Sequence, residues 1–260
     1  MEQATSRAVV LRKVVYGEAD LVLTLLSRDL GKLSALARGA RSSRRRFGAA
    51  LELFTVSSVE LRAHRSELWT LSSAETALSF PTIARDIGAL AHASYGTELV
   101  RELSAPEQPE PAVFDLLVDL FRALDRRGAR ADVLRAFELA LLADVGLAPA
   151  LEACAACGRT GETGALDRGA LLDPARGGVV CAACAPASRA AGVRPLSSAA
   201  RAVLVSAQRA GQAGELAGVE LELGEDAAEA REAMLALLGH HVARPLRTLE
   251  FLGKLSRPAT

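Results

Sequence analysis

The chain has 260 residues, 50% of them hydrophobic and 24% charged, and this composition excludes a disordered or fibrous protein. Its length suits one large domain or two of ordinary size, and we expect two. The formal net charge is zero, which by itself says nothing about nucleic acid. However, residues 1–80 carry 12 basic and 8 acidic side chains, a net charge of +4, which residues 81–260 balance with −4. The charge is therefore divided between the two parts of the chain.

The N-terminal sequence MEQATSRAVVLRK lacks the basic segment and apolar run of a signal peptide. No stretch reaches 18 uncharged apolar residues, the length expected of a membrane helix. We therefore expect a cytoplasmic protein with no membrane contact. In that reducing compartment disulfides are disfavoured, so paired cysteines favour a metal site.

Residues 1–80 have the pattern of β-strands. Five short segments are rich in Val, Leu and Thr and are separated by Gly, Asp and Ser: VVLRKVVY, DLVLTLLS, KLSALA, LELFTVSSVEL and ELWTLSS. Gly31 follows the second segment at a position that favours a positive φ. Five short antiparallel strands in this length predict a small closed barrel of the OB-fold type, as a domain of residues 1–80.

A basic segment, RGARSSRRRF, lies between the third and fourth predicted strands and contains no acidic residue. Loops of OB barrels flank the face that binds single strands, and the planar guanidinium group suits phosphate oxygens. The alternative is an ordinary solvated loop. Because the segment lies in the net-basic part of the chain, we interpret it as a DNA-binding surface, which Lys13 and Lys32 could extend, with five arginines: Arg38, Arg41, Arg44, Arg45 and Arg46.

Aromatic residues are scarce, with ten in the whole chain. The barrel region contains Tyr16, Phe47 and Trp69. Trp69 shares a strand face with Leu71, so we expect it to pack in the core rather than to stack on bases. Few aromatic platforms predict binding dominated by the phosphate backbone and tolerant of base sequence.

From residue 81 onward apolar residues recur at helical spacing. The pattern predicts helices around residues 113–124 and 134–145, then around 197–210 and 226–243, with a Pro-rich loop at 104–111. We therefore predict a helical second domain, residues 81–260, and an α+β protein overall. Motifs of nucleotide-binding loops and of common hydrolases are absent from the sequence, which favours a protein that is not an enzyme.

All four cysteines lie in two C-x-x-C pairs separated by 23 residues: Cys154, Cys157, Cys181 and Cys184. Two such turns supply four thiolates to one tetrahedral Zn²⁺ ion and leave no open position for catalysis. The segment GALLDPARGGVV between them can form two short strands. We therefore predict one structural zinc per chain in a ribbon embedded at residues 151–187; a redox pair and free thiols are the alternatives.

Several stretches resemble the bacterial recombination mediator family RecO. In the N-terminal part they are AVVLRKVVYGEADLVLTLLSRDLGKLSALARGAR and GAALELFTVSSVEL. Further on they are FELALLADVGLAPALEACAACG, the second pair CAAC, and LRTLEFL near the end. Together they span nearly the whole chain.

This resemblance implies an N-terminal OB-fold, a helical C-terminal domain and a four-cysteine zinc ribbon. It further implies a cytoplasmic, nucleoid-associated protein without enzymatic activity, which binds single- and double-stranded DNA and anneals complementary strands. With RecR, such a protein helps RecA onto strands coated by single-stranded-DNA-binding protein. The resemblance assigns DNA contact to the arginines of the basic segment. It also assigns the acidic tail of single-stranded-DNA-binding protein to Arg135, although only one arginine precedes the Phe-Glu pair here.

Two other functions are compatible with the same residues. A zinc-ribbon transcription factor would bind a defined duplex, so competition between a random single strand and that duplex separates it from the first hypothesis. A nucleic-acid-modifying enzyme with structural zinc would change its substrate chemically.

Overall fold

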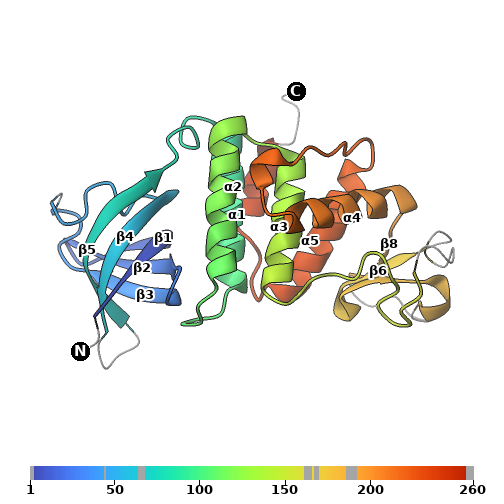
Figure 1. Cartoon of the computed structure of the whole chain (residues 1–260), viewed down its shortest axis with the longest axis horizontal. Helices are drawn as coiled ribbons and strands as arrows, with labels where there is room; N and C mark the ends of the chain where they lie inside the picture. Colours follow the sequence, from blue (N-terminus) through green and yellow to red (C-terminus); the bar gives the residue numbers. More distant parts are fainter. Residues whose placement is uncertain are drawn as a thin grey trace. The chain divides into compact units, whose positions relative to one another are not determined.

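The strands of the N-terminal part form the closed five-stranded barrel that their pattern predicts (Figure 1). The computed structural model describes residues 3–43, 45–63, 68–160, 166, 170–185 and 192–255. Neighbouring strands are antiparallel except β3 and β5, which pair in parallel. This is the OB-fold. The strands close in the order β1-β2-β3-β5-β4, with bounds β1 (Gln3–Tyr16), β2 (Asp20–Ser27), β3 (Gly31–Ala37), β4 (Thr55–Arg62) and β5 (Leu68–Ser79).

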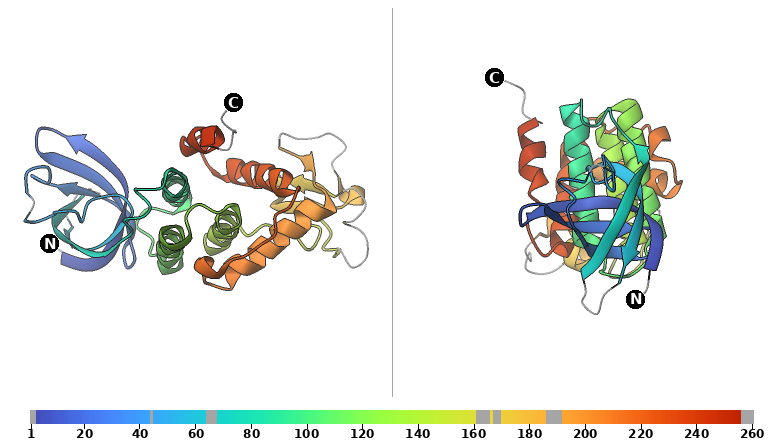
Figure 2. Two further views of the ribbon diagram at one scale, coloured as in Figure 1. Left: turned by 90° about the horizontal axis from the view of Figure 1, so that it is seen from above. Right: turned by 90° about the vertical axis from the view of Figure 1, so that its left-hand side faces the viewer.

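Alternating apolar residues build the barrel interior. Leu21, Leu23 and Leu25 of β2 are all buried in one cluster with side chains of every other strand. The long strand β1 has a bulge between Val10 and Arg12, and bulges bend a strand. Its first half therefore pairs with β4 and its second half with β2, which closes the barrel shown in Figure 2.

The fourth strand begins later than its sequence pattern predicts. β4 starts at Thr55, and residues 47–54 form turns instead. Three apolar residues of this stretch, Phe47, Ala50 and Leu51, are nevertheless buried in the barrel cluster and fill the interior from the loop, whereas Leu53 is exposed. Their burial, rather than a strand, explains the apolar pattern.

Packing divides the chain into two compact units, Met1–Ala129 with Arg247–Thr260, and Arg130–Leu246. The first unit joins the barrel to α1 (Ile87–Leu103), α2 (Pro111–Arg127) and α6 (Thr248–Leu255). Phe121 of α2 contacts Phe54 and Phe80, with ring centroids 5.6 and 5.7 Å apart. The boundary predicted after residue 80 marks the change from strands to helices, which is a different division from this one.

Gly31 is a point of close approach within the first unit. Its φ is +74°, as the turn pattern predicts, and a Cβ there would lie 2.0 Å from the carbonyl oxygen of Gln108. Only glycine satisfies both the conformation and the contact.

The second unit consists of helices and a small sheet. The predicted hairpin forms from β6 (Leu171–Asp173) and β7 (Gly178–Val180), and β8 (Arg194–Pro195) adds a third strand to β6. One-turn helices η2 (Pro174–Arg176), η3 (Ala182–Cys184) and η4 (Leu216–Gly218) connect these elements. The main helices are α3 (Ala131–Asp144), α4 (Ser198–Gln212) and α5 (Ala227–His241).

Each long helix of the second unit agrees with its predicted position to within a few residues. Gly146, with φ +78°, follows the end of α3. Gly211 allows α4 to approach α3, since a Cβ there would lie 2.4 Å from the carbonyl oxygen of Ala136. Among the helices that the structure describes, none has both the length and the apolar character needed to cross a membrane.

Candidate nucleic-acid interface and metal centre

The basic loop, defined as residues 38–46, connects β3 to the turns before β4. Arg38, Arg41, Arg45 and Arg46 are exposed, whereas Arg44 lies outside the described residues. The structure therefore brings four of the five predicted arginines to one exposed loop of the barrel. In the described part of the chain, no carboxylate forms an ion pair with any of these four.

Hydrogen bonds hold the start of this loop against the turn between β1 and β2. The backbone N–H of Gly39 donates to Asp20 Oδ1 over 2.7 Å. Arg41 donates from its backbone N to the Ala19 carbonyl over 3.0 Å, and from Nη1 to the Glu18 carbonyl over 2.7 Å. The arginines are thus carried by a loop with a defined path.

The end of the basic loop is organised by Arg46. Its Nη2 donates to the Arg38 carbonyl over 2.7 Å, and its Nε donates to Ser43 Oγ over 3.2 Å. The guanidinium carbon lies 5.0 Å from the centroid of the Phe47 ring, a cation–π contact. Because carbonyl and hydroxyl groups accept these bonds, the positive charge of Arg46 is not neutralised.

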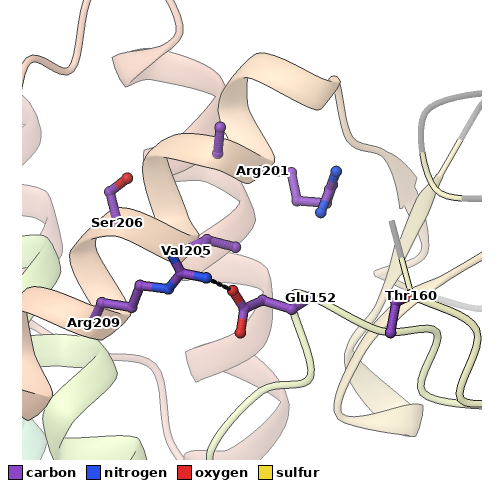
Figure 3. Close-up of a pocket in the computed structure, with 7 residues that line it drawn as sticks. Glu152, Thr160, Arg201, Val205, Ser206 and Arg209 are labelled. Atoms are coloured by element: carbon purple, nitrogen blue, oxygen red, sulfur yellow. Dashed lines mark hydrogen bonds and ion pairs between the residues drawn. The ribbon is translucent and has the colours of Figure 1, made fainter. Parts of the chain in front are cut away.

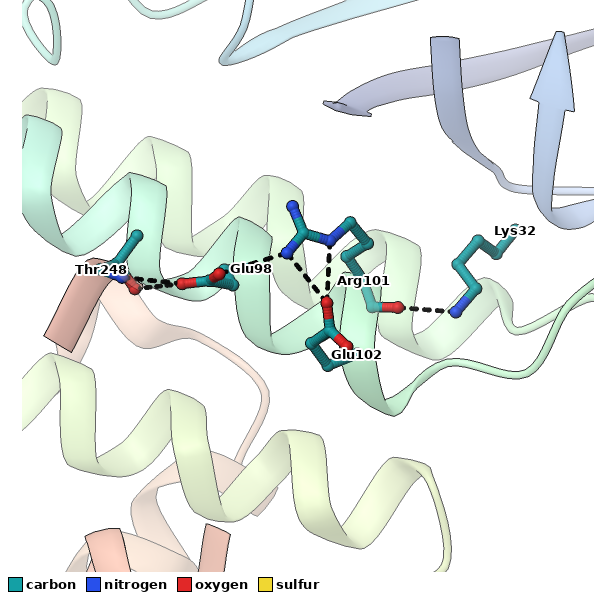
Figure 4. Close-up of polar contacts among 5 residues, drawn as sticks. All are labelled: Lys32, Glu98, Arg101, Glu102 and Thr248. Atoms are coloured by element: carbon teal, nitrogen blue, oxygen red, sulfur yellow. Dashed lines mark hydrogen bonds and ion pairs between the residues drawn. The ribbon is translucent and has the colours of Figure 1, made fainter. Parts of the chain in front are cut away.

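The two lysines that could extend this surface have partners inside the protein, and their contact with DNA stays a prediction. Lys13 Nζ forms an ion pair with Glu52 Oε2 at 3.0 Å. Lys32 Nζ donates to the Arg101 carbonyl over 2.6 Å, a contact drawn in Figure 4. Burial of Lys32 lowers its pKa. Lys13 therefore pairs at the surface, whereas Lys32 is partly buried against α1.

The three aromatic residues of the barrel have different environments. Phe47 is buried, and Trp69 packs against the barrel cluster, as its position beside Leu71 predicts. Tyr16, at the end of β1, has 61% of its surface exposed.

The four cysteines come together in the second unit. Their Sγ atoms all lie within 4.8 Å of one another, so they could hold one metal ion. The sulfurs of Cys157 and Cys181 are 3.9 Å apart, and all four thiols are free rather than in disulfides. A tetrahedron with zinc–sulfur bonds of about 2.3 Å has edges of about 3.8 Å. The donor set and its spacing therefore fit a tetrahedral thiolate site.

Local backbone conformation produces this cluster. Gly158 has φ +71°, a left-handed conformation, and its N–H donates to the Cys154 carbonyl over 2.8 Å. At the second pair, the corresponding residue Ala185 has φ −58°, so the two turns differ. The Cys181 N–H donates to Cys154 Sγ over 3.3 Å, which links the two pairs directly.

Ionisation of the cluster is uneven. Burial opposes ionisation of Cys154, but backbone N–H groups led by that of Cys181 outweigh it and lower the pKa of its thiol to about 6. Hydrogen bonding to Cys157 and Cys181 raises the pKa of Cys184 to about 12. These contacts therefore favour the thiolate form of Cys154, the form that binds a cation.

Arg135, the residue expected to receive an acidic tail, lies on α3. It is only 6% exposed, and its Nη2 donates to Glu138 Oε1 over 2.8 Å. Its Nη1 lies 2.8 Å from Glu138 Oε2, so the two groups face each other through both pairs of atoms. Binding of a peptide carboxylate by Arg135 would require Glu138 to move.

A pocket of about 620 Å³ lies between α4 and the segment around the first cysteine pair (Figure 3). Arg209 forms an ion pair with Glu152 across it, and Arg201 Nη1 donates to the Leu151 carbonyl over 3.3 Å. Sequence reasoning missed these residues. Two arginines eight positions apart on an Ala-rich helix carry no local signal, because the wall opposite them comes from residues about 50 positions earlier.

Comparison with known proteins agrees with this architecture. Residues 1–80 match the family described as Recombination protein O N terminal, and residues 84–250 match Recombination protein O C terminal. The DNA repair protein RecO of Anaeromyxobacter dehalogenans (strain 2CP-C) is 43% identical over 256 residues, which cover 98% of each chain. That of Myxococcus xanthus (strain DK1622) is 38% identical over 98% of this chain and 99% of its own. The chain therefore belongs to the RecO family of DNA repair proteins.

Proposed function

We propose that this protein is a recombination mediator without enzymatic activity, acting in the cytoplasm and at the nucleoid. In this proposal it binds single- and double-stranded DNA and anneals complementary strands. With RecR, it promotes loading of RecA onto strands coated by single-stranded-DNA-binding protein. Membership of the RecO family supports this role, since its members are DNA repair proteins.

The observation that carries the proposal is the basic loop. Its described arginines are exposed, lack carboxylate partners among the described residues and are held on a fastened backbone. Uncompensated guanidinium groups attract phosphates of any base sequence. We assign the phosphate contacts to Arg38, Arg41, Arg44, Arg45 and Arg46.

We further propose that the cysteine cluster holds one structural Zn²⁺ ion. The spacing of the sulfurs supports a tetrahedral site, and four thiolates leave no coordination position for a substrate. The ion would supply folding energy to a segment whose strands are only three residues long or shorter.

For the acidic tail of single-stranded-DNA-binding protein we retain Arg135 as the proposed contact. The tail carboxylate would take the place of the Glu138 carboxylate. Arg135 already faces both oxygens of Glu138, so its guanidinium group is oriented for bidentate binding of a carboxylate. Because Arg135 is already paired with Glu138, the tail must displace Glu138 in order to bind.

Replacement of Arg38 and Arg45 by alanine tests the DNA-binding surface. Affinity for a random single strand should fall. The slope of its logarithm against the logarithm of salt concentration should flatten by about 0.7 for each phosphate that the protein no longer neutralises. Arg46 is left in place because it shapes the loop. Fluorescence anisotropy at several salt concentrations measures both quantities.

The matched control replaces Arg194 and Arg209, which removes the same charge from the second unit. This control should bind as the parent protein does. If both double variants lose affinity equally, or if the parent shows no dependence on salt, the basic loop is not the DNA-binding surface. Annealing of strands coated with single-stranded-DNA-binding protein then tests the mediator role in the same set of variants.

A further inference from the structure

The outer face of the barrel has an apolar end at which Val22 and Leu36 are partly buried and the residues of β1 are exposed. Val14 and Tyr16 are 42% and 61% exposed. The strand register places Val14 opposite Val22, and Val22 opposite Leu36. Because residues paired directly across a sheet share a face, Val14, Val22 and Leu36 form a row across three strands. Tyr16 follows Val14 on the same side of β1, two residues further on.

At the other end of this outer face, the apolar residues are buried. Val9 and Leu26 are paired in register, lie outside the interior cluster of the barrel and are both fully buried. Within the same unit, α1 packs against β1. The apolar outer face is therefore buried at Val9 and Leu26, and at its other end it carries an exposed aromatic ring.

Three arginines lie near the exposed end, together with the acidic residues Glu18 and Asp20. Arg12 lies on the same face as Val14 and Tyr16 and is exposed. On the other side, Arg41 is bonded to the Glu18 carbonyl, two residues from Tyr16, and Arg38 directly follows β3. Asp20, the partner of Tyr16 in the ladder, accepts the Gly39 N–H, so part of its hydrogen-bonding capacity is directed to the basic loop.

From this arrangement we propose that Tyr16, with the row Val14, Val22 and Leu36, forms a base-stacking platform for single-stranded nucleic acid. This inference rests on the proposed DNA-binding function and assigns it a second kind of contact. A single strand offers unstacked bases to the ring while its phosphates reach the adjacent arginines. A duplex offers only phosphates, because its base faces are already stacked. The platform therefore gives the barrel a preference for single strands.

The test compares a base-bearing oligonucleotide with an abasic one of the same length, which keeps only the sugar-phosphate backbone. The parent protein should bind the base-bearing strand more tightly. Tyr16→Ala should lower affinity for that strand by about 5-fold to 150-fold, the range of one aromatic stack, and leave the abasic strand unaffected. Tyr16→Phe should retain parental affinity, since the ring is preserved. The salt slope should stay the same in all variants, since every arginine and lysine is kept.

Val15→Ala is the matched control. Val15 is 60% exposed and adjacent to Tyr16, but it pairs with the inward-facing Leu21 and so lies on the opposite side of β1. It should bind both strands as the parent does.

Each contrary result has a distinct meaning. Equal binding of base-bearing and abasic strands by the parent would overturn the platform and leave phosphate binding intact. Equal loss of affinity for both strands in Tyr16→Ala would also overturn it, because the residue would then serve the loop structure. Absence of binding to either strand would overturn the proposed function together with this inference.

Discussion

At the scale of single residues, Glu98 shows how one side chain connects distant parts of the sequence. It is 6% exposed on α1, and its Oε2 accepts from both the N–H and the hydroxyl of Thr248, over 2.9 and 2.7 Å (Figure 4). Its Oε1 lies 3.2 Å from Arg101 Nη2. Thr248 is the first residue of α6, so Glu98 caps the start of that helix.

This arrangement predicts a stability that depends on pH. Burial by itself would raise the pKa of Glu98, but the hydrogen bonds from Thr248 and Arg247 and the charge of Arg101 outweigh it. The net effect lowers the pKa below its ordinary value of 4.5. A carboxyl group with a lowered pKa stabilises the fold fully above its unfolded-state value. That contribution should therefore be lost as the pH falls below 4.5, through the value in the folded protein.

Substitution of Glu98 checks this. Glu98→Ala should lower the free energy of unfolding at pH 7 by about 1.5–3 kcal/mol, because two donors lose a charged acceptor. In Glu98→Gln, the part of the pH dependence of unfolding that Glu98 contributes should disappear. Denaturant unfolding at pH 7 and pH 4 measures both effects. Glu102→Gln, which alters a neighbour of Arg101 and spares Thr248, is the control. An unchanged pH dependence in Glu98→Gln would contradict this account.

At the scale of elements, the sequence predicts those whose stability comes from their own apolar pattern. The amphipathic stripes of α2 and α3 locate both helices, and alternation locates the strands of the barrel. It does not predict α6 or β8. α6 has eight residues and depends on a cap 150 positions away, while β8 has two residues and exists only as a partner of β6. Periodicity cannot reveal elements that distant contacts define.

The candidate sites follow the same rule. Cysteine spacing predicts the metal cluster because both pairs are local turns, and the arginine run predicts the basic loop because the run is contiguous. The apolar row beside Tyr16 could not be predicted, since it requires the register between β1, β2 and β3. Likewise, only the structure shows that Lys32 is held by α1 and that Arg135 is held by Glu138.

The ribbon gives a prediction at this scale. Cys154→Ser should reduce the zinc content from about one ion per chain to near zero, because Cys154 is a buried member of the cluster and accepts the Cys181 N–H. Elemental analysis of untagged protein measures this. Ala156→Ser places the same hydroxyl in the same turn without removing a ligand, and it should keep the metal. A metal-free parent protein would overturn the zinc assignment.

At the scale of the whole molecule, the two units are stabilised by different features: the hydrophobic cluster of the barrel in the first, and the cysteine cluster in the second. Among the residues that the structure describes, the barrel cluster consists of side chains from residues 8 to 74, whereas all four cysteines belong to Arg130–Leu246. The change of periodicity near residue 80 cannot predict this division. It depends on α1, α2 and α6 packing in the same unit as the barrel, through contacts such as those of Phe121 and Thr248.

Because the cysteine cluster and the barrel cluster are in different units, metal removal should affect the ribbon and the DNA-binding barrel differently. Chelation of the full-length protein should abolish the ribbon, which the metal would stabilise by up to about 10–16 kcal/mol in the most metal-dependent case. It should leave single-strand affinity unchanged, because neither the barrel cluster nor the basic loop contains a ribbon residue. Thermal unfolding measures the stability of the ribbon, and anisotropy measures the DNA affinity of the same chelated sample. Zinc added back should restore the thermal stability and leave the DNA affinity as it was. If single-strand affinity falls in proportion to the zinc removed, the ribbon itself contributes to the DNA surface, and the assignment of DNA binding to the barrel alone is wrong.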